Sequence, residues 1–124
     1  MRPTVWITGA SSGIGAALVK TFSSAGYKVA LTARGVDALE QLVSELPESA
    51  ETLIVAGDVT DREGMAAAAA EVAAWGNGIH ILCNNAGLNI PRRSWADLDW
   101  ESWDHLLSVN ITGALNVIAA CLPI

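Results

Sequence analysis

Residues 8–15 read TGASSGIG, and this stretch decides the fold of the 124-residue chain. It follows a short apolar run, residues 5–7, that is typical of a buried strand, and it leads into a helical pattern. Its glycines are Gly9, Gly13 and Gly15, so the spacing is G-x-x-x-G-x-G. A turn between a buried strand and a helix start directs backbone N–H groups outward, where the helix dipole favours negative charge. The stretch therefore predicts an anion site.

Each position of this turn has a physical role in such a site. Gly9 can adopt a positive φ, and Gly13 leaves out a side chain where a phosphate approaches the backbone. Gly15 lets the helix pack closely on the sheet, while Ser11 and Ser12 supply hydroxyl donors. An ordinary strand-to-helix turn is the alternative, and the glycines alone do not separate the two.

Strands and helices alternate outward from the turn. We expect strands at residues 5–7, 28–33, 52–56 and 79–83, and helices at residues 14–25, 36–46, 61–75 and 100–122. This order predicts an α/β fold, a parallel sheet covered on both faces. Right-handed crossovers make it a doubly wound, Rossmann-like domain over residues 1–124, with strand order 3-2-1-4. In the first helix, Ile14, Leu18 and Phe22 are predicted to form the buried face.

Composition and charge exclude several classes of protein. The chain is 52% hydrophobic and 16% charged, which excludes a disordered chain and suggests surface covered by more protein. The formal net charge is −6, and Arg92 and Arg93 are the only adjacent basic residues, so we expect no nucleic-acid partner and interpret this pair as part of a solvated loop.

The sequence indicates a cytoplasmic protein without a membrane partner. No apolar run reaches the roughly 18 residues of a membrane span, and no signal peptide precedes the first strand. Cys83 and Cys121 are interpreted as reduced thiols of a cytosolic protein.

The end of the second predicted strand suggests which dinucleotide would fit. This position reads the adenosine ribose: an acid binds a free 2′-hydroxyl, whereas an arginine accommodates a 2′-phosphate. Ala33 offers no carboxylate, and Arg34 offers a planar donor group suited to phosphate. Asp37 is the nearby acid, and we interpret it as a first-turn residue of the next helix. The sequence therefore favours NADP over NAD.

Four motifs together resemble the short-chain dehydrogenase/reductase family, and they cover essentially the whole chain. They are residues 8–15, Asp58-Val59, Asn84-Asn85-Ala86-Gly87, and Val109-Asn110 before Thr112-Gly113. The resemblance implies that residues from Gly9 to Gly15, Ile14 included, hold the pyrophosphate and its flanking ribose.

The resemblance also implies roles for the other motifs. Asp58 would hydrogen-bond the adenine amino group beside the Val59 backbone, although a turn or cap residue is the alternative for Asp58. Asn84, Asn85, Ala86 and Gly87 would lie along the cofactor and brace the sheet. Arg34 would match the NADP-selecting arginine. Asn110 would match the active-site asparagine that holds a water of the proton relay; a mid-helix asparagine on an apolar face is costly without a partner, and a satisfied core amide is the alternative.

The chain departs from the family at its catalytic residues. The family uses a tyrosine acid/base, a lysine four residues later and a serine. The only tyrosine is Tyr27, residue 31 is leucine, and the only lysines are Lys20 and Lys28. The resemblance therefore describes an N-terminal, cofactor-binding half, truncated before the fifth strand and inactive alone.

The expected function is that of an oxidoreductase. Its parent protein would transfer hydride between NADP(H) and a small-molecule carbonyl or alcohol, and this chain would carry the cofactor half only. A non-catalytic NADP-binding or interaction module, or an inactive fragment, is the alternative. The last helix is apolar on more than one side and packs between subunits in the family, so we expect a homo-oligomer through this helix. We expect no metal site.

Overall fold

The computed structural model describes residues 2–88 and 94–124, so the predicted Arg92-Arg93 pair lies outside the described residues. The strands are β1 (Thr4–Thr8), β2 (Lys28–Thr32), β3 (Thr52–Ile54) and β4 (Ile81–Cys83). The helices are α1 (Gly13–Ser24), α2 (Val36–Ser44), α3 (Arg62–Gly76), the 3-10 turn η1 (Trp95–Asp97), α4 (Trp100–Leu107), the π-helix η2 (Ser108–Gly113) and α5 (Ala114–Cys121).

The four strands form one parallel sheet in the order β3-β2-β1-β4, which confirms the predicted fold and strand order. Val5 of β1 is the register partner of both Val29 in β2 and Ile81 in β4. Because all strands run the same way, their carboxyl ends meet at one edge. β1 is one residue longer than expected at each end, whereas β2, β3 and β4 are one or two residues shorter; β4 begins at Ile81, not at residue 79.

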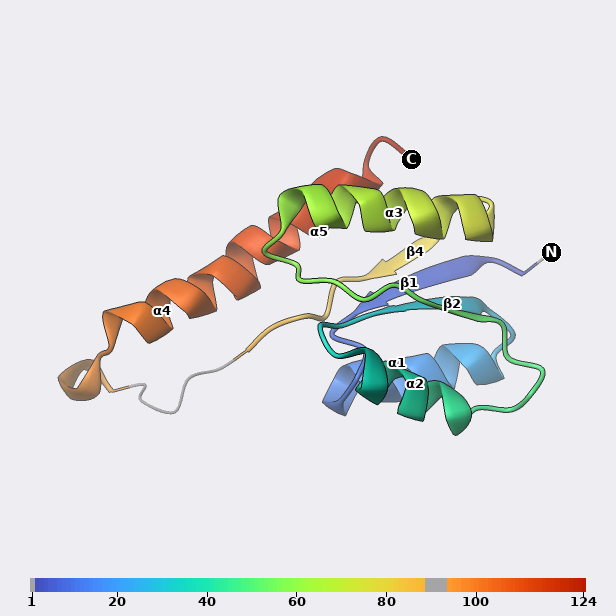
Figure 1. Cartoon of the computed structure of the whole chain (residues 1–124), viewed down its shortest axis with the longest axis horizontal. Helices are drawn as coiled ribbons and strands as arrows, with labels where there is room; N and C mark the ends of the chain where they lie inside the picture. The colour runs from blue at the N-terminus through green and yellow to red at the C-terminus, as the bar shows by residue number, and fades with distance from the viewer. Residues whose placement is uncertain (1, 89–93) are drawn as a thin grey trace.

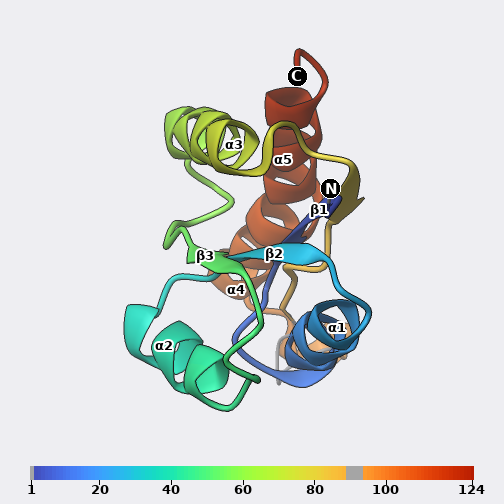
Figure 2. The ribbon, with the colours of Figure 1, turned by 90° about the vertical axis from the view of Figure 1, so that its right-hand side faces the viewer.

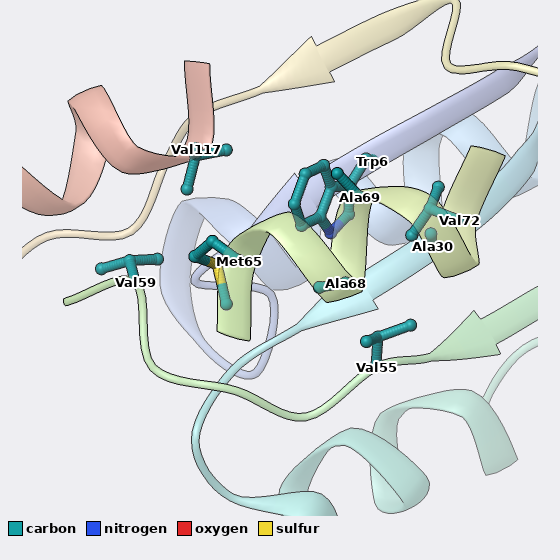
Figure 3. Close-up of a cluster of buried hydrophobic side chains, with 9 residues drawn as sticks. All are labelled: Trp6, Ala30, Val55, Val59, Met65, Ala68, Ala69, Val72 and Val117. Carbon is teal, nitrogen blue, oxygen red and sulfur yellow. The ribbon is translucent and has the colours of Figure 1, made fainter. Parts of the chain in front are cut away.

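Helices cover both faces of the sheet. In Figures 1 and 2, α3 and α5 lie on one face and α1 and α2 on the other. Strand side chains alternate between the faces: Trp6 and Ala30 join the cluster under α3 and α5 (Figure 3), whereas Ile7 and Leu31 join the cluster under α1 and α2. This double burial explains why the strands are almost continuously apolar.

The predicted buried face of α1 is partly wrong. Gly15 and Val19 are the buried residues of this helix, and Leu18 and Phe22 are half-buried against the core. Ile14 is 73% exposed. Ile14 lies in the first turn of α1, where it lines a pocket instead of packing in the core.

The last predicted helix is also not regular. Instead of one α-helix over residues 100–122, the structure has α4, the six-residue π-helix η2 and α5 in direct succession. Figure 1 shows α4 extending away from the sheet and α5 lying beside α3. A π segment widens the turn and is frequent at functional sites. It contains Asn110 and Gly113, which both approach loops of the sheet.

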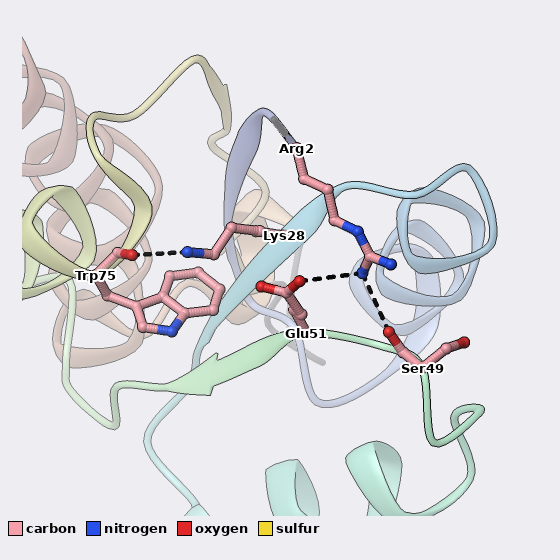
Figure 4. A network of polar contacts seen from close by, with 5 residues as sticks. All are labelled: Arg2, Lys28, Ser49, Glu51 and Trp75. Atoms are coloured by element: carbon pink, nitrogen blue, oxygen red, sulfur yellow. Dashed lines mark hydrogen bonds and ion pairs between the residues drawn. The ribbon is translucent and has the colours of Figure 1, made fainter.

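Polar contacts close the amino-terminal edge of the sheet (Figure 4). Lys28 Nζ donates to the Trp75 carbonyl at 2.7 Å and lies 4.2 Å from the centroid of its ring, so it pairs a carbonyl at the C-terminus of α3. Arg2 reaches Glu51 at 3.4 Å and donates to the Ser49 carbonyl at 3.1 Å. The opposite edge, at the carboxyl ends of the strands, holds the candidate site.

Candidate functional site

A cavity of about 490 Å³ lies at the carboxyl edge of the sheet, where open α/β sheets bind ligands. Its volume falls within the roughly 300–1,000 Å³ typical of small-molecule sites. Most predicted binding residues line it: Gly9, Ser11, Ser12, Ile14, Arg34, Asp58, Val59, Asn85, Ala86 and Gly87. Six further residues line the cavity that were not predicted as binding residues, although Ala33 and Val109 stand beside predicted ones: Thr32, Ala33, Gly35, Gly57, Leu88 and Val109. Their position just after strands or within neighbouring motifs was the available signal.

The glycine turn combines positive φ angles with close packing. Gly9 has φ +63° and Gly13 has φ +56°. A Cβ at Gly9 would lie 2.9 Å from the Cα of Ala86, and a Cβ at Gly15 would collide with the carbonyl oxygen of Gly9. Nothing lies within 4 Å of a Cβ at Gly13, so the structure leaves open space where the sequence predicted the approach of a phosphate.

Thr8 joins this turn to the loop after β4. Its buried Oγ1 accepts hydrogen bonds from the N–H groups of Asn85 and Ala86, both at 3.0 Å. The Asn85 Nδ2 donates back to the Gly9 carbonyl at 3.3 Å. These bonds satisfy buried polar groups and hold the two loops together as one wall of the cavity. Sequence reasoning assigned Thr8 no such role; a hydroxyl at the end of a buried strand was the signal.

The amino end of α1 supplies a positive electrostatic wall. Ser12 occupies the N-cap position with extended backbone, φ −155° and ψ 167°, and its side chain makes no capping hydrogen bond. The first turn of α1 contains no acidic residue, so no carboxylate there opposes the helix dipole. This end of α1 suits an anionic group.

Arg34 and Asp58 lie on the adjoining wall. The Asp58 Oδ1 accepts hydrogen bonds from the Thr60 N–H at 2.9 Å and the Thr60 hydroxyl at 2.8 Å. The Thr60 backbone bond is the main cause that holds the pKa of Asp58 below its ordinary value; burial opposes it, while the Thr60 hydroxyl and the Arg34 charge add to it. Asp58 is thus both a turn residue and a cavity residue, whereas the N-cap of α3 is Asp61.

Arg34 is exposed and lies two residues after the end of β2, next to Ala33. It is the only basic residue among the described residues that line the cavity. Asp37 lies in the first turn of α2, as predicted, and does not line the cavity. The wall beside Ala33 therefore presents a guanidinium and no carboxylate except that of Asp58.

Two predicted asparagines lie outside the cavity wall. The Asn84 Nδ2 donates to the Ala114 carbonyl of α5 at 3.0 Å. The Asn110 side chain pairs twice with the backbone of Leu88: Oδ1 accepts from its N–H at 2.8 Å, and Nδ2 donates to its carbonyl at 2.8 Å. Asn110 is exposed, so it is not a core amide, and it fixes a cavity residue through the backbone.

Tyr27 lies at the opposite edge of the sheet from the cavity. It immediately precedes β2 at the amino edge of the sheet and packs edge-to-face on Phe22, with ring centroids 5.0 Å apart. Cys83 and Cys121 are free, and burial raises the pKa of both thiols.

Two other kinds of feature are absent from the part of the chain that the structure describes. Across residues 2–88 and 94–124, every helix is too short or too polar to cross a bilayer. In the same ranges, no three histidine, cysteine, aspartate or glutamate side chains come together as a metal-ion site requires.

Known proteins resemble the chain in both sequence and fold. The family model described as short chain dehydrogenase matches residues 3–124. The chain is 37% identical to the sulfoacetaldehyde reductase of Chromohalobacter salexigens and 36% identical to the serine 3-dehydrogenase of Agrobacterium fabrum, each over 123 residues. Both alignments cover 99% of this chain and 49% of the relative, so the chain spans about half the length of the curated relatives that it matches.

Solved structures with either dinucleotide resemble the chain. A metagenomic short-chain oxidoreductase in complex with NADP has a TM-score of 0.89 and 32% identity, over 98% of this chain and 55% of that one. NAD⁺-bound xylitol dehydrogenase has a TM-score of 0.91 and 28% identity, over 96% of this chain and 46% of that one. The fold therefore does not distinguish NADP from NAD.

Proposed function

Because the chain belongs to the short-chain dehydrogenase family, we propose that its 124 residues bind NADP(H) for an oxidoreductase that acts on a carbonyl or alcohol. One observation carries the proposal: the glycine turn, the amino end of α1, Arg34 and Asp58 line a single cavity of about 490 Å³. When bound, the nicotinamide ring supplies or accepts the hydride. The residues of this chain bind and orient the cofactor.

The walls of the cavity suit different parts of a dinucleotide. Ser12 and the N–H groups at the start of α1 suit the pyrophosphate, because they offer donors and a positive dipole end. The ionised carboxylate of Asp58 is an acceptor for the adenine amino group, with the Val59 backbone beside it. Asn110 holds the backbone of Leu88, and we propose that it also holds a water for proton transfer in the whole protein.

The choice of NADP over NAD rests on Arg34. A guanidinium binds a 2′-phosphate through parallel hydrogen bonds, and the methyl side chain of Ala33 beside it provides no acceptor for a free 2′-hydroxyl. The formal net charge of −6 disfavours any anionic ligand at long range, so a local cation has to compensate for it.

We propose that binding occurs without turnover in these 124 residues. Tyr27 lies at the wrong edge of the sheet, and residue 31 is a buried leucine rather than a lysine. A non-catalytic NADP-binding module is the second candidate, and this lack of a Tyr-x-x-x-Lys pair is the observation that favours it.

We further propose that α5 is covered by a second copy of the chain. Four large apolar residues within α5 or near its ends are exposed: Ile111, Leu115, Ile118 and Leu122. Contiguous exposed apolar surface of this kind is typical of an interface. A homo-oligomer would bury it, and sedimentation of the purified chain measures its mass directly.

Calorimetric titration with NADPH and NADH tests the proposed cofactor. We expect saturable binding, tighter for NADPH. Arg34→Ala should weaken NADPH binding about tenfold and leave NADH binding nearly unchanged, because only NADPH carries the 2′-phosphate. Arg2→Ala is the matched control, since Arg2 is an exposed arginine at the opposite edge of the sheet. An equal loss for both cofactors would contradict the assignment of Arg34.

A further inference from the structure

A buried asparagine joins the last helix to the Asp58 side of the cavity. Asn116 lies on α5 and is only 4% exposed. Its Nδ2 donates to the Val59 carbonyl at 2.9 Å, and its Oδ1 accepts from the Arg62 Nε at 3.0 Å. Both ends of the amide are therefore paired with the segment that leads from the cavity into α3.

Val59 is held by its side chain as well. It is 7% exposed, and its Cγ2 would lie only 2.6 Å from a Cβ built at Gly113. Gly113, the last residue of η2, thus leaves room for Val59 because it has no side chain, and Asn116 of α5 fixes the Val59 backbone. Two independent contacts locate the same residue against the helix.

The rest of the segment has few other anchors. At its start, the Gly57 N–H donates to the Ala33 carbonyl at 3.0 Å. At its end, the Asp61 N–H donates to the Asp58 carbonyl at 2.9 Å, a bond within the turn itself. Val59, the residue directly after Asp58, is therefore held by a side chain from outside this segment, that of Asn116 in α5.

We propose that Asn116 is a positioning residue for the nucleotide, because it fixes the Val59 carbonyl and so sets where Asp58 meets the adenosine half. This inference rests on the proposed function, in which the cavity holds NADP(H). Without Asn116, a buried carbonyl loses its donor and the segment shifts to find another partner. Asp58 moves with it, since the two residues are adjacent.

The identity of the side chain supports a role beyond helix packing. The neighbouring Val117 is fully buried in the core cluster, so Asn116 lies beside apolar packing on the buried side of α5. A buried amide costs free energy unless its polar atoms are paired, and both of those in Asn116 are paired. Through this amide, α5 makes directional hydrogen bonds to the segment that carries Asp58 and Val59.

The test compares two variants at Asn116 with one core control. Asn116→Leu removes the amide, and Asn116→Asp keeps its shape and an acceptor for Arg62 but removes the donor to Val59. Val72→Ala is the control, because Val72 is fully buried in the same cluster as Val117 and does not line the cavity. Each protein is titrated calorimetrically with 2′,5′-ADP well below its melting temperature.

We expect both Asn116 variants to bind 2′,5′-ADP about tenfold more weakly, which corresponds to about 1.4 kcal/mol. Amide hydrogen exchange at Thr60 and Asp61 should become faster in both. Val72→Ala should lower the melting temperature but leave the affinity unchanged, since a purely structural effect does not move this readout.

The outcomes separate the two proposals. If the unsubstituted chain does not bind 2′,5′-ADP, the proposed function fails and the role of Asn116 fails with it. If the unsubstituted chain binds and the Asn116 variants bind equally well, or if Val72→Ala loses as much affinity, only the role of Asn116 is refuted. Unchanged exchange at Thr60 and Asp61 refutes it as well.

Discussion

Adding one methyl group at Gly9 tests whether the turn and the loop after β4 form a rigid wall. At φ +63°, an alanine adopts the left-handed region, which costs about 1–2 kcal/mol. Its Cβ would also lie 2.9 Å from the Cα and 3.1 Å from the N of Ala86. These are backbone atoms, held by the Thr8 hydroxyl, so they cannot rotate away as a flexible side chain can.

The structure provides a control that separates strain from collision. Gly13 has a similar φ of +56°, but nothing lies within 4 Å of a Cβ there. Gly13→Ala therefore costs only the backbone strain, about 1–2 kcal/mol. Gly9→Ala adds overpacking, which costs about a further 1–3 kcal/mol. We expect the free energy of unfolding to fall by about 2–5 kcal/mol in total for Gly9→Ala.

Urea unfolding followed by tryptophan fluorescence measures both variants on one scale. The chain has five tryptophans, and the buried Trp6 of β1 reports directly on the sheet. The difference between the two variants is the cost of the collision. If Gly9→Ala is no less stable than Gly13→Ala, Ala86 yields freely and the two loops are not one rigid wall.

Substitutions at two further residues, Thr8 and Asp58, test single groups at the same edge of the sheet. Thr8→Val should lower the free energy of unfolding by about 2 kcal/mol, because two backbone N–H groups lose their acceptor. Thr8→Ser keeps the hydroxyl acceptor and should cost much less. A small loss of stability for Thr8→Val in urea unfolding would contradict this role of the hydroxyl. Asp58 has a lowered pKa, so its stabilising contribution is present above its unfolded-state pKa near 3.8 and is lost as the pH falls through the lower folded-state pKa. Urea midpoints measured as the pH falls below about 4 should therefore drop more steeply for the unsubstituted chain than for Asp58→Asn, and identical acid limbs would refute the stabilising role of the ionised carboxylate.

Local sequence signals predicted the fold because they depend on neighbouring residues. Alternating apolar runs and helical periods indicated the order of elements, and chirality left few ways to connect them. The caps of α3 are local in the same sense. Asp61 accepts from the Gly64 N–H at the start of α3, and Asn77 ends that helix in the left-handed region with φ 55°.

The errors arose where tertiary structure decides. Ile14 fits the apolar period of α1, but the period does not show that this residue lines a pocket and not the core. The apolar period of a regular helix likewise does not predict the π-helix η2. Its wider turn accompanies contacts of Asn110 with Leu88 and of Gly113 with Val59, which are distant in sequence.

The motifs of the candidate site were predictable from the sequence, but the long-range hydrogen bonds that hold its loops in place were not. Most motif residues line the cavity, as the strand-end positions indicated. The bonds from Thr8 to Asn85 and from Asn116 to Val59 join residues 77 and 57 positions apart. No local pattern reports such pairs, because they form only when the sheet brings its carboxyl ends together.

The central claim is that the carboxyl edge of the sheet holds a nicotinamide dinucleotide. Mapping of backbone amide chemical shifts during titration with NADPH tests it most directly. We expect saturable shifts that are largest at cavity residues such as Gly9, Ser12, Arg34 and Asp58, while Lys28 at the amino edge does not shift. Shifts that do not saturate, or that are largest around Lys28, would contradict the claim.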